Sequence, residues 1–253
     1  MTLIKISITS DPVCPWCYIA YRRLLKAIAL FQKTYPGARN DEIRITWKPY
    51  FLDRDAPMES VPYLDRMIQK LGDADKVPGA QAHLRRLGLQ DGIQFRFGGR
   101  IGNTLRAHQL ILWSELQDSA NERQTSEITN AVVQALFQAH FEEERDICDV
   151  ETLVRIAAQA CPGLDVDGLG LRAWLETGRG VARIEWLADQ ARAEGLLGVP
   201  YFQMGEGEGG KTLNGAQDVN EFLETLVAYK EGSSTTTTAT ATATTDEALG
   251  NTC

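Results

Sequence analysis

The start of the chain shows two different hydrophobic periods in succession. Apolar and polar residues alternate over residues 4–9, the period of a strand with one buried face. Apolar residues then recur at spacings of four, three and four over residues 20–31, as on one face of an α-helix, which ends near residues 35–37. Alternation returns over residues 43–48. The pattern predicts the order strand, helix, strand.

A long helical stretch follows. From residue 57 to residue 195 the apolar positions keep almost entirely to a helical period, with clear stripes over residues 128–139 and 181–191. Asp149 stands just before another such stripe, where its side chain would cap the first turn of a helix. We therefore expect residues 57–195 to form a helical insertion.

The last part of the chain returns to strands before one more helix. Residues 200–204 and 211–213 flank a glycine-rich turn and predict a β-hairpin. A helix is expected over residues 219–230. Residues 232–253 are rich in Ser, Thr and Ala, and they have too few apolar groups to offset the entropy of ordering. This tail is expected to be disordered.

Charge and composition narrow the classes of function. The net charge is -8 and the isoelectric point is near 5.0, which disfavours nucleic-acid binding because that binding needs Lys and Arg to neutralise phosphates. No apolar run is long enough for a membrane span, and alternation begins too early for a signal peptide. Five cysteines suit a reducing compartment better than a disulfide scaffold. We expect a cytoplasmic protein with neither nucleic-acid nor membrane partners.

The sequence Cys14-Pro15-Trp16-Cys17 lies between the first strand and the first helix. The amide groups and dipole of a helix start stabilise an anion, so Cys14 is expected to be the attacking thiolate. Cys17 lies one turn further and is expected to be the resolving thiol. Pro15 suits a first helical turn, and Trp16 offers an apolar surface to a substrate. This motif predicts disulfide exchange.

Zinc binding and inert core thiols are the other interpretations of two closely spaced cysteines. Zinc needs further ligands, and no second close pair exists among Cys148, Cys161, Cys253 and the three histidines. We therefore predict no metal. Cys148 and Cys161 could form an auxiliary redox pair, but with twelve residues between them we favour two unrelated buried thiols.

Residues 10–18, which include the two-cysteine motif, resemble the opening of DsbA-like thioredoxin-fold proteins, specifically the FrnE-like subgroup. Further similarities extend over nearly all of the chain before the tail. They are Asn103-Thr104, Ala107-His108, Leu136-Phe137, Phe141, Gly198 to Phe202, and Gly215 to Gln217.

The resemblance implies an α/β, thioredoxin-like fold with a large all-helical insertion. The thioredoxin-like domain would comprise residues 1–56 and 196–231, the insertion residues 57–195, and the tail residues 232–253. The resemblance also implies that the Val199-Pro200 peptide bond is cis and faces the two cysteines. Pro200 would then belong to the catalytic site, and the Val199 backbone would pair with a substrate peptide.

Three polar residues are weaker candidates for the site. Asn103 and His108 match the family without an assigned role, and His108 lies among apolar residues, which favours packing. Asp11 could tune a thiol or transfer a proton, but Asp before Pro is also a common turn former. Both interpretations of Asp11 remain open.

Disulfide exchange with protein substrates, in the reductase or isomerase direction, is the predicted activity, and it requires no organic cofactor. Glutathione is a candidate co-substrate. One alternative is a glutathione-dependent isomerase or transferase like the related chromene-carboxylate isomerases and kappa-class transferases, although these generally carry Ser at the position of Cys14. Another is a redox-inert chaperone or binding module.

Overall fold

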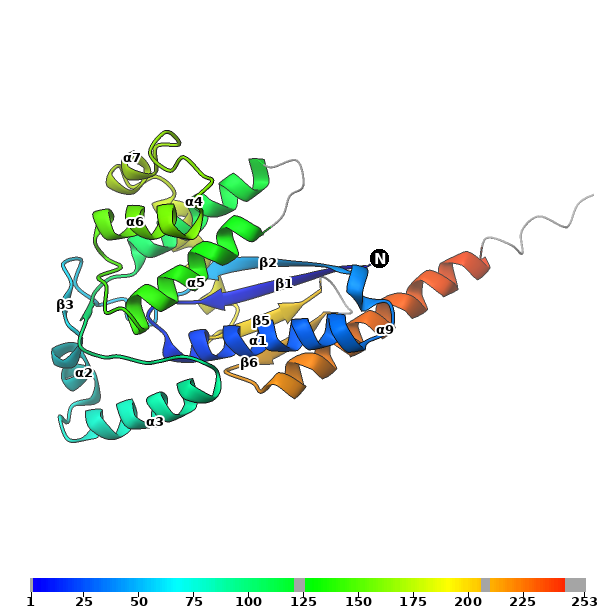
Figure 1. The fold of residues 1–253 in the computed structure, drawn as a ribbon, viewed down its shortest axis with the longest axis horizontal. Coiled ribbons are helices and arrows are strands. Elements are labelled where there is room, and N and C mark those ends of the chain that lie inside the picture. Colours follow the sequence, from blue (N-terminus) through cyan, green and yellow to red (C-terminus); the bar gives the residue numbers. More distant parts are fainter. Residues whose placement is uncertain (1, 121–125, 206–209, 244–253) are drawn as a thin grey trace, which may run out of the picture.

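A four-stranded mixed sheet forms the centre of the computed structural model, which describes residues 2–120, 126–205 and 210–243, the last stretch without side chains from residue 233. The strand order is β2-β1-β5-β6 (Figure 1). β1 (Leu3–Ser10) runs parallel to β2 (Glu42–Pro49) and antiparallel to β5 (Tyr201–Met204), which pairs with β6 (Lys211–Asn214). The predicted strands and hairpin are confirmed.

The alternation in β1 divides buried from accessible positions. Ile4, Ile6 and Ile8 are at most 1% exposed, whereas Lys5 between them is exposed. Helix α1 (Pro15–Thr34) follows and buries the predicted stripe, which ends at Phe31. It packs along α9 (Val219–Ala243), so residues from the two ends of the chain lie side by side (Figure 1).

The segment between β2 and β5 is helical, as predicted. Two short features have no sequence signal, because a two-residue strand and a single 3-10 turn are too short to show a period. One is the pair β3 (Val61–Pro62) with β4 (Arg100–Ile101) within this segment, and the other is the turn η1 (Ala38–Asn40), which lies earlier in the chain, between α1 and β2. The helices are α2 (Tyr63–Leu71), α3 (Lys76–Gln90), α4 (Leu105–Ala120), α5 (Glu127–Phe141), α6 (Val150–Ala160), α7 (Leu171–Glu176) and α8 (Val181–Ala193).

The helical segment shares a core with the thioredoxin-like part. The ring of Tyr18 on α1 stacks on Phe137 of α5 at 5.1 Å, and its hydroxyl donates a 2.6 Å hydrogen bond to Glu142. One cluster of buried side chains extends from the sheet through α1 into α4, α5 and α6. Because this core is continuous, the helical segment fixes the position of α1. The domain boundaries themselves stay a prediction.

Side chains from the helical segment also cover the outer edge of β2. The Ile45 amide donates to Ser126 Oγ at 3.1 Å, and the Trp47 amide donates to Glu115 Oε1 at the same distance. An uncovered edge strand would present these amides to another chain, so these bonds protect the sheet. At the start of α6, Asp149 caps the helix as predicted, accepting from the Thr152 amide at 2.8 Å.

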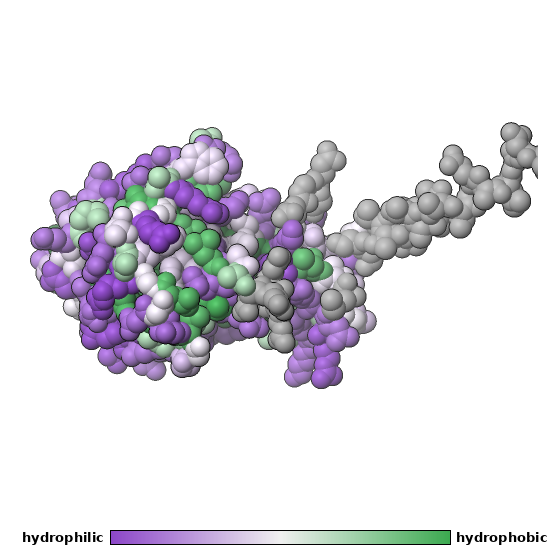
Figure 2. Space-filling view, turned by 90° about the horizontal axis from the view of Figure 1, so that it is seen from above, coloured by the Kyte–Doolittle hydropathy of each residue, from purple (hydrophilic) through white to green (hydrophobic). Residues whose placement is uncertain are grey.

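Helix α9 continues to Ala243, beyond the predicted end at residue 230. The prediction was too short because it followed apolar positions only, whereas a helix that has already formed can extend by one backbone hydrogen bond per added residue without an apolar stripe. Residues 244–253 of the predicted tail, including Cys253, lie outside the described residues. Within the described ranges no helix is long and apolar enough to cross a membrane. Polar and apolar side chains are interspersed over the face seen in Figure 2.

Candidate active site

The two-cysteine motif occupies the predicted junction between β1 and α1. Cys14 has an extended backbone at the N-cap position, and Pro15 is the first helical residue. The Cys14 carbonyl accepts hydrogen bonds from the amides of Cys17 at 3.1 Å and Tyr18 at 3.3 Å. The Cys14 thiol therefore lies at the start of a 20-residue helix, where the helix dipole favours negative charge.

The two thiols are close together and almost enclosed. Cys14 and Cys17 are each 2% exposed, while Trp16 between them is 39% exposed. Burial raises the pKa of Cys17 well above its ordinary value, and the neighbouring Cys14 raises it further. The Ser10 hydroxyl and the Asp11 backbone act in the opposite direction. Cys17 thus stays a protonated thiol beside Cys14, which agrees with the resolving role predicted for it.

Val199 and Pro200 lie against Cys14 from the other end of the sequence. Their peptide bond is cis, as the resemblance implies. The Cys14 Sγ lies 3.7 Å from the Val199 carbonyl oxygen, and the Pro200 carbonyl accepts from the Gly215 amide at 2.8 Å. The fold therefore brings Val199 and Pro200 to the two cysteines of the motif. The roles of Val199 and Pro200 toward a substrate stay predictions.

Asp11 is 1% exposed, and its hydrogen bonds link three chain segments, an arrangement called the Asp11 bracket below. Its carboxylate accepts from the Val13 amide at 3.4 Å and from the Leu52 amide at 2.7 Å, and it also bonds the Thr104 side chain. Burial raises the pKa of Asp11 to about 6, although these hydrogen bonds oppose the rise. The bonds show that the Asp11 side chain holds the cysteine loop against residues 50–52 and the start of α4.

His108 packs beside Asp11 without charge. Its Nε2 donates to the Tyr50 carbonyl at 3.1 Å, and its ring meets Phe51 edge-on at 5.3 Å. Burial lowers the pKa of His108 to about 4, so the imidazole is neutral near pH 7. These contacts agree with the packing role favoured from the sequence.

Asn103 organises the turn before α4. Its Oδ1 accepts from the Leu105 amide at 2.9 Å, and its own amide donates to the Pro57 carbonyl at 2.9 Å. These bonds give Asn103 a role in shaping the turn that carries Thr104 to Asp11, whereas no described contact joins it to the cysteines.

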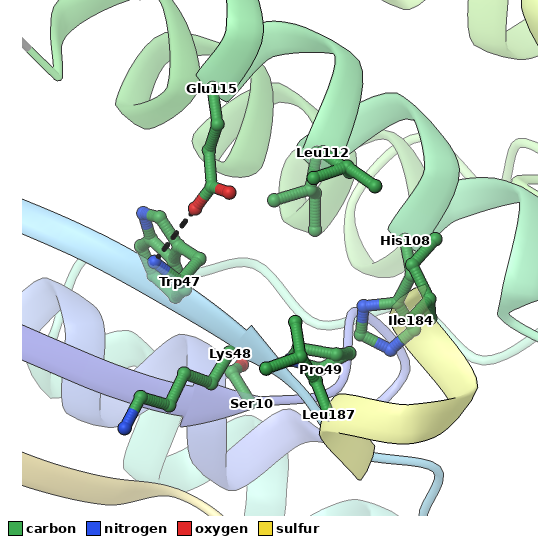
Figure 3. Close-up of a pocket in the computed structure, with 10 residues that line it drawn as sticks. Ser10, Trp47, Lys48, Pro49, His108, Leu112, Glu115, Ile184 and Leu187 are labelled. Carbon is green, nitrogen blue, oxygen red and sulfur yellow. Dashed lines mark hydrogen bonds between the residues drawn. The ribbon is translucent and has the colours of Figure 1, made fainter. Parts of the chain in front are cut away.

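A small cavity lies between the ends of β1 and β2 and the helices α4 and α8 (Figure 3). Its volume is about 20 Å³, enough for one water molecule, and Ser10, His108 and Glu115 line it together with apolar residues. The buried Ser10 hydroxyl makes no hydrogen bond to a nitrogen or oxygen atom among the described residues, and it lies beside Cys17, whose pKa it lowers. Burial raises the pKa of Glu115 to about 7, against the hydrogen bond from the Trp47 amide. Sequence reasoning missed Ser10 and Glu115, although Ser10 extends the buried face of β1.

Cys148 and Cys161 do not form a second redox pair. Cys148 precedes α6 and Cys161 follows it, and an 11-residue helix is roughly 16 Å long, far beyond the ~7 Å between Cα atoms that a disulfide allows. Burial raises the pKa of Cys148 to about 12. The pairing hypothesis is therefore wrong, and the two are unrelated thiols. Among the described residues, no three His, Cys, Asp or Glu side chains form a group that could hold a metal ion.

Comparison with known families agrees with this geometry. Residues 5–227 match the DSBA-like thioredoxin domain. The chain belongs to the DsbA-like thioredoxin family. This confirms the fold class and places the chain in a family of thiol-disulfide oxidoreductases, while the FrnE-like subgroup stays a prediction. No curated protein matches the sequence at a significant level.

Several solved structures share the fold of this DsbA-like chain. A probable DsbA oxidoreductase from Streptomyces coelicolor is 24% identical, with 90% of this chain and 91% of that chain covered and a TM-score of 0.73. The cytosolic disulfide reductase DsbM from Pseudomonas aeruginosa is 18% identical, with coverages of 93% and 99% and a TM-score of 0.56; it has also been solved with glutathione. A 2-hydroxychromene-2-carboxylate isomerase is 18% identical, with coverages of 94% and 98% and a TM-score of 0.55.

Proposed function

We propose that the protein exchanges thiols and disulfides with protein substrates through Cys14 and Cys17, in the reductase or isomerase direction. The observation that carries the proposal is the pair of adjacent thiols at a helix start, one of them against the Val199 carbonyl and the other held protonated by burial. Nothing in this chemistry needs an organic cofactor.

The exchange proceeds in two balanced steps. The Cys14 thiolate attacks one sulfur of a substrate disulfide, forming a mixed disulfide and releasing the other substrate sulfur as a thiolate. Cys17 then loses its proton and attacks the Cys14 sulfur, which forms the Cys14-Cys17 disulfide and releases the second substrate thiolate. The substrate gains two electrons and the motif loses them. In the isomerase direction, a substrate thiol displaces Cys14 before Cys17 reacts.

A thiol reductant then restores the dithiol, and glutathione is our candidate for this co-substrate. Two glutathione thiols would reduce the Cys14-Cys17 disulfide and leave as glutathione disulfide. We extend the proposal to a cytoplasmic location because a reducing compartment keeps such a pair cycling.

Single-cysteine variants test the proposal. Cys14→Ala is expected to abolish reduction of a disulfide protein, and Cys17→Ala is expected to accumulate mixed disulfides that a non-reducing gel resolves. Cys161→Ala is the matched control, because this thiol lies beyond α6 and is expected to leave both readouts unchanged. Undiminished reduction by Cys14→Ala would contradict the proposal. Glutathione-dependent turnover of a small molecule without Cys17 would favour the isomerase or transferase alternative instead.

A titration of the Cys14-Cys17 pair against glutathione gives the direction. A difference of about 30 mV from the glutathione poise corresponds to about 1.4 kcal/mol for a two-electron couple. A potential below that of the glutathione pool supports the reductase direction, and one well above it contradicts that direction.

A further inference from the structure

A groove beside Cys14 has no role in the exchange steps described above. It has a volume of about 570 Å³ and runs along the segment from the end of α8 to the start of β5. Its lining includes Val199, whose carbonyl oxygen lies 3.7 Å from the Cys14 Sγ. The groove therefore reaches the reactive sulfur through Val199, so a substrate chain held at Cys14 has this groove within reach on one side of its cysteine.

One apolar side chain that lines the groove is almost fully exposed to solvent. Leu197 is 97% exposed, and it lies two residues before Val199. Within the described part of the chain, the amides of Leu197 and Gly198 donate no hydrogen bond to another backbone group. An extended peptide can therefore pair with this backbone while it covers the Leu197 side chain, which removes apolar surface from water.

The charge of the groove is negative. Glu194 is the only carboxylate or cation among the described residues that line it, and it lies at the C-terminal end of the 13-residue helix α8, where the dipole adds partial negative charge. Arg192, the cation in the same helical turn, does not line the groove, because its guanidinium donates a hydrogen bond to the Phe51 carbonyl and lies over the Tyr50 ring. The groove thus disfavours an acidic ligand.

We propose that this groove binds the segment flanking the reactive cysteine of a protein substrate, and that Leu197 and Glu194 select apolar and basic residues in that segment. The inference rests on the proposed function and names its substrate class. Glutathione carries two carboxylates, so it would reach the Cys14-Cys17 disulfide without filling the groove.

Three capped peptides test this selection. Each is the symmetrical disulfide of a short peptide with Leu, Lys or Asp two residues before its cysteine, and hydroxyethyl disulfide serves as a small neutral substrate that cannot fill the groove. Wild-type kcat/KM is expected to be roughly tenfold higher for the Leu and Lys peptides than for the Asp peptide. Equal values for the three peptides would overturn the inference.

Two variants assign the selection to residues. Leu197→Ser is expected to lower the ratio of Leu-peptide to hydroxyethyl disulfide turnover about fivefold. Glu194→Lys is expected to reverse the preference for Lys over Asp, and it suits a helix C-terminus, so the variant should fold. Leu30→Ser is the control, because Leu30 is 37% exposed on the same helix as the motif but about 22 Å from the start of that helix.

The outcomes separate the two proposals. An unchanged Lys-to-Asp ratio in Glu194→Lys would overturn the selection by charge, even if Leu197→Ser proved unstable. The same loss of Leu-peptide preference in Leu30→Ser would overturn the assignment to the groove. Failure of the wild type to reduce a disulfide protein or any of these disulfides would refute the proposed function rather than the groove.

Discussion

The carboxyl group of Asp11 and the imidazole of His108 lie 3.9 Å apart in the interior, and backbone groups hold both of them. Asp11 accepts from the amides of Val13 and Leu52, whereas His108 donates to the Tyr50 carbonyl. The loop before Cys14 is thereby tied to residues 50–52 from two directions. Burial raises the pKa of Asp11 to about 6 and lowers that of His108 to about 4, so near pH 7 His108 is neutral and Asp11 is mostly the carboxylate that accepts these bonds.

Asp11→Ala should destabilise the protein by about 2 kcal/mol, because it leaves the Val13 and Leu52 amides without their acceptor. Asp11→Asn keeps one acceptor oxygen and should lose less. Asp55→Ala, at an exposed position of the same region, should stay within about 0.5 kcal/mol of the wild type. Urea denaturation measures all three. Equal stabilities for Asp11→Ala and Asp55→Ala would show that the bracket contributes nothing.

The pH dependence of stability tests Glu115. Its pKa rises from an ordinary 4.5 to about 7 on folding, so the folded state binds the proton more tightly. This contribution to stability is present below about pH 4.5 and is lost as the pH rises through 7. Glu115→Gln keeps an acceptor for the Trp47 amide but cannot ionise, so its stability relative to the wild type should increase by about 1 kcal/mol between pH 5 and pH 8, discounting for solvent access.

Thermal unfolding of the wild type and Glu115→Gln across that pH range gives the comparison. The two proteins must be compared because other buried groups also make stability depend on pH. The raised pKa of Asp11 lowers the stability of the protein as the pH rises, as that of Glu115 does. The pKa values of His108 and His140, which burial lowers to about 4, raise the stability as the pH rises. A constant difference between the two proteins at all pH values would contradict the raised pKa of Glu115.

Tyr18→Phe tests the link between the motif helix and the helical segment. The variant keeps the stacking on Phe137 but removes the 2.6 Å hydrogen bond to Glu142, and it should cost about 1 to 2 kcal/mol because the acceptor is a carboxylate. Tyr35→Phe is the control, since its hydroxyl makes a long, exposed 3.4 Å bond and should matter little. In a Glu142→Gln background the cost of Tyr18→Phe should shrink, and an unchanged cost would exclude the bond as its cause.

Local patterns predicted the strands, the long helices and the cysteine motif because each of these leaves a period or a spacing in the sequence. The partners of Asp11 could not be predicted, because Leu52 and Thr104 reach it only through the tertiary fold. Glu115 was missed for a related reason: it reads as an ordinary polar position on α4 until the edge of β2 is placed against it. The resemblance, and not the pattern, supplied the cis bond before Pro200.

Gly102→Ala tests how closely the turn before α4 is packed. A Cβ at this position would lie 2.9 Å from the Pro57 carbonyl oxygen, 3.0 Å from the Cys148 Sγ and 3.1 Å from the Ser60 Cα. Two of these atoms belong to the backbone, so the turn must shift, and the variant should lose about 1 to 3 kcal/mol of stability. Gly163→Ala is the matched control, because nothing lies within 4 Å of its Cβ and Ala restricts the unfolded chain.

A shift of the turn would also move Thr104 away from Asp11. We therefore expect Gly102→Ala to slow disulfide reduction more than Gly163→Ala does when both variants are assayed well below their unfolding temperatures. Equal stability of the two variants would show that this turn tolerates a side chain and does not fix the bracket around Asp11.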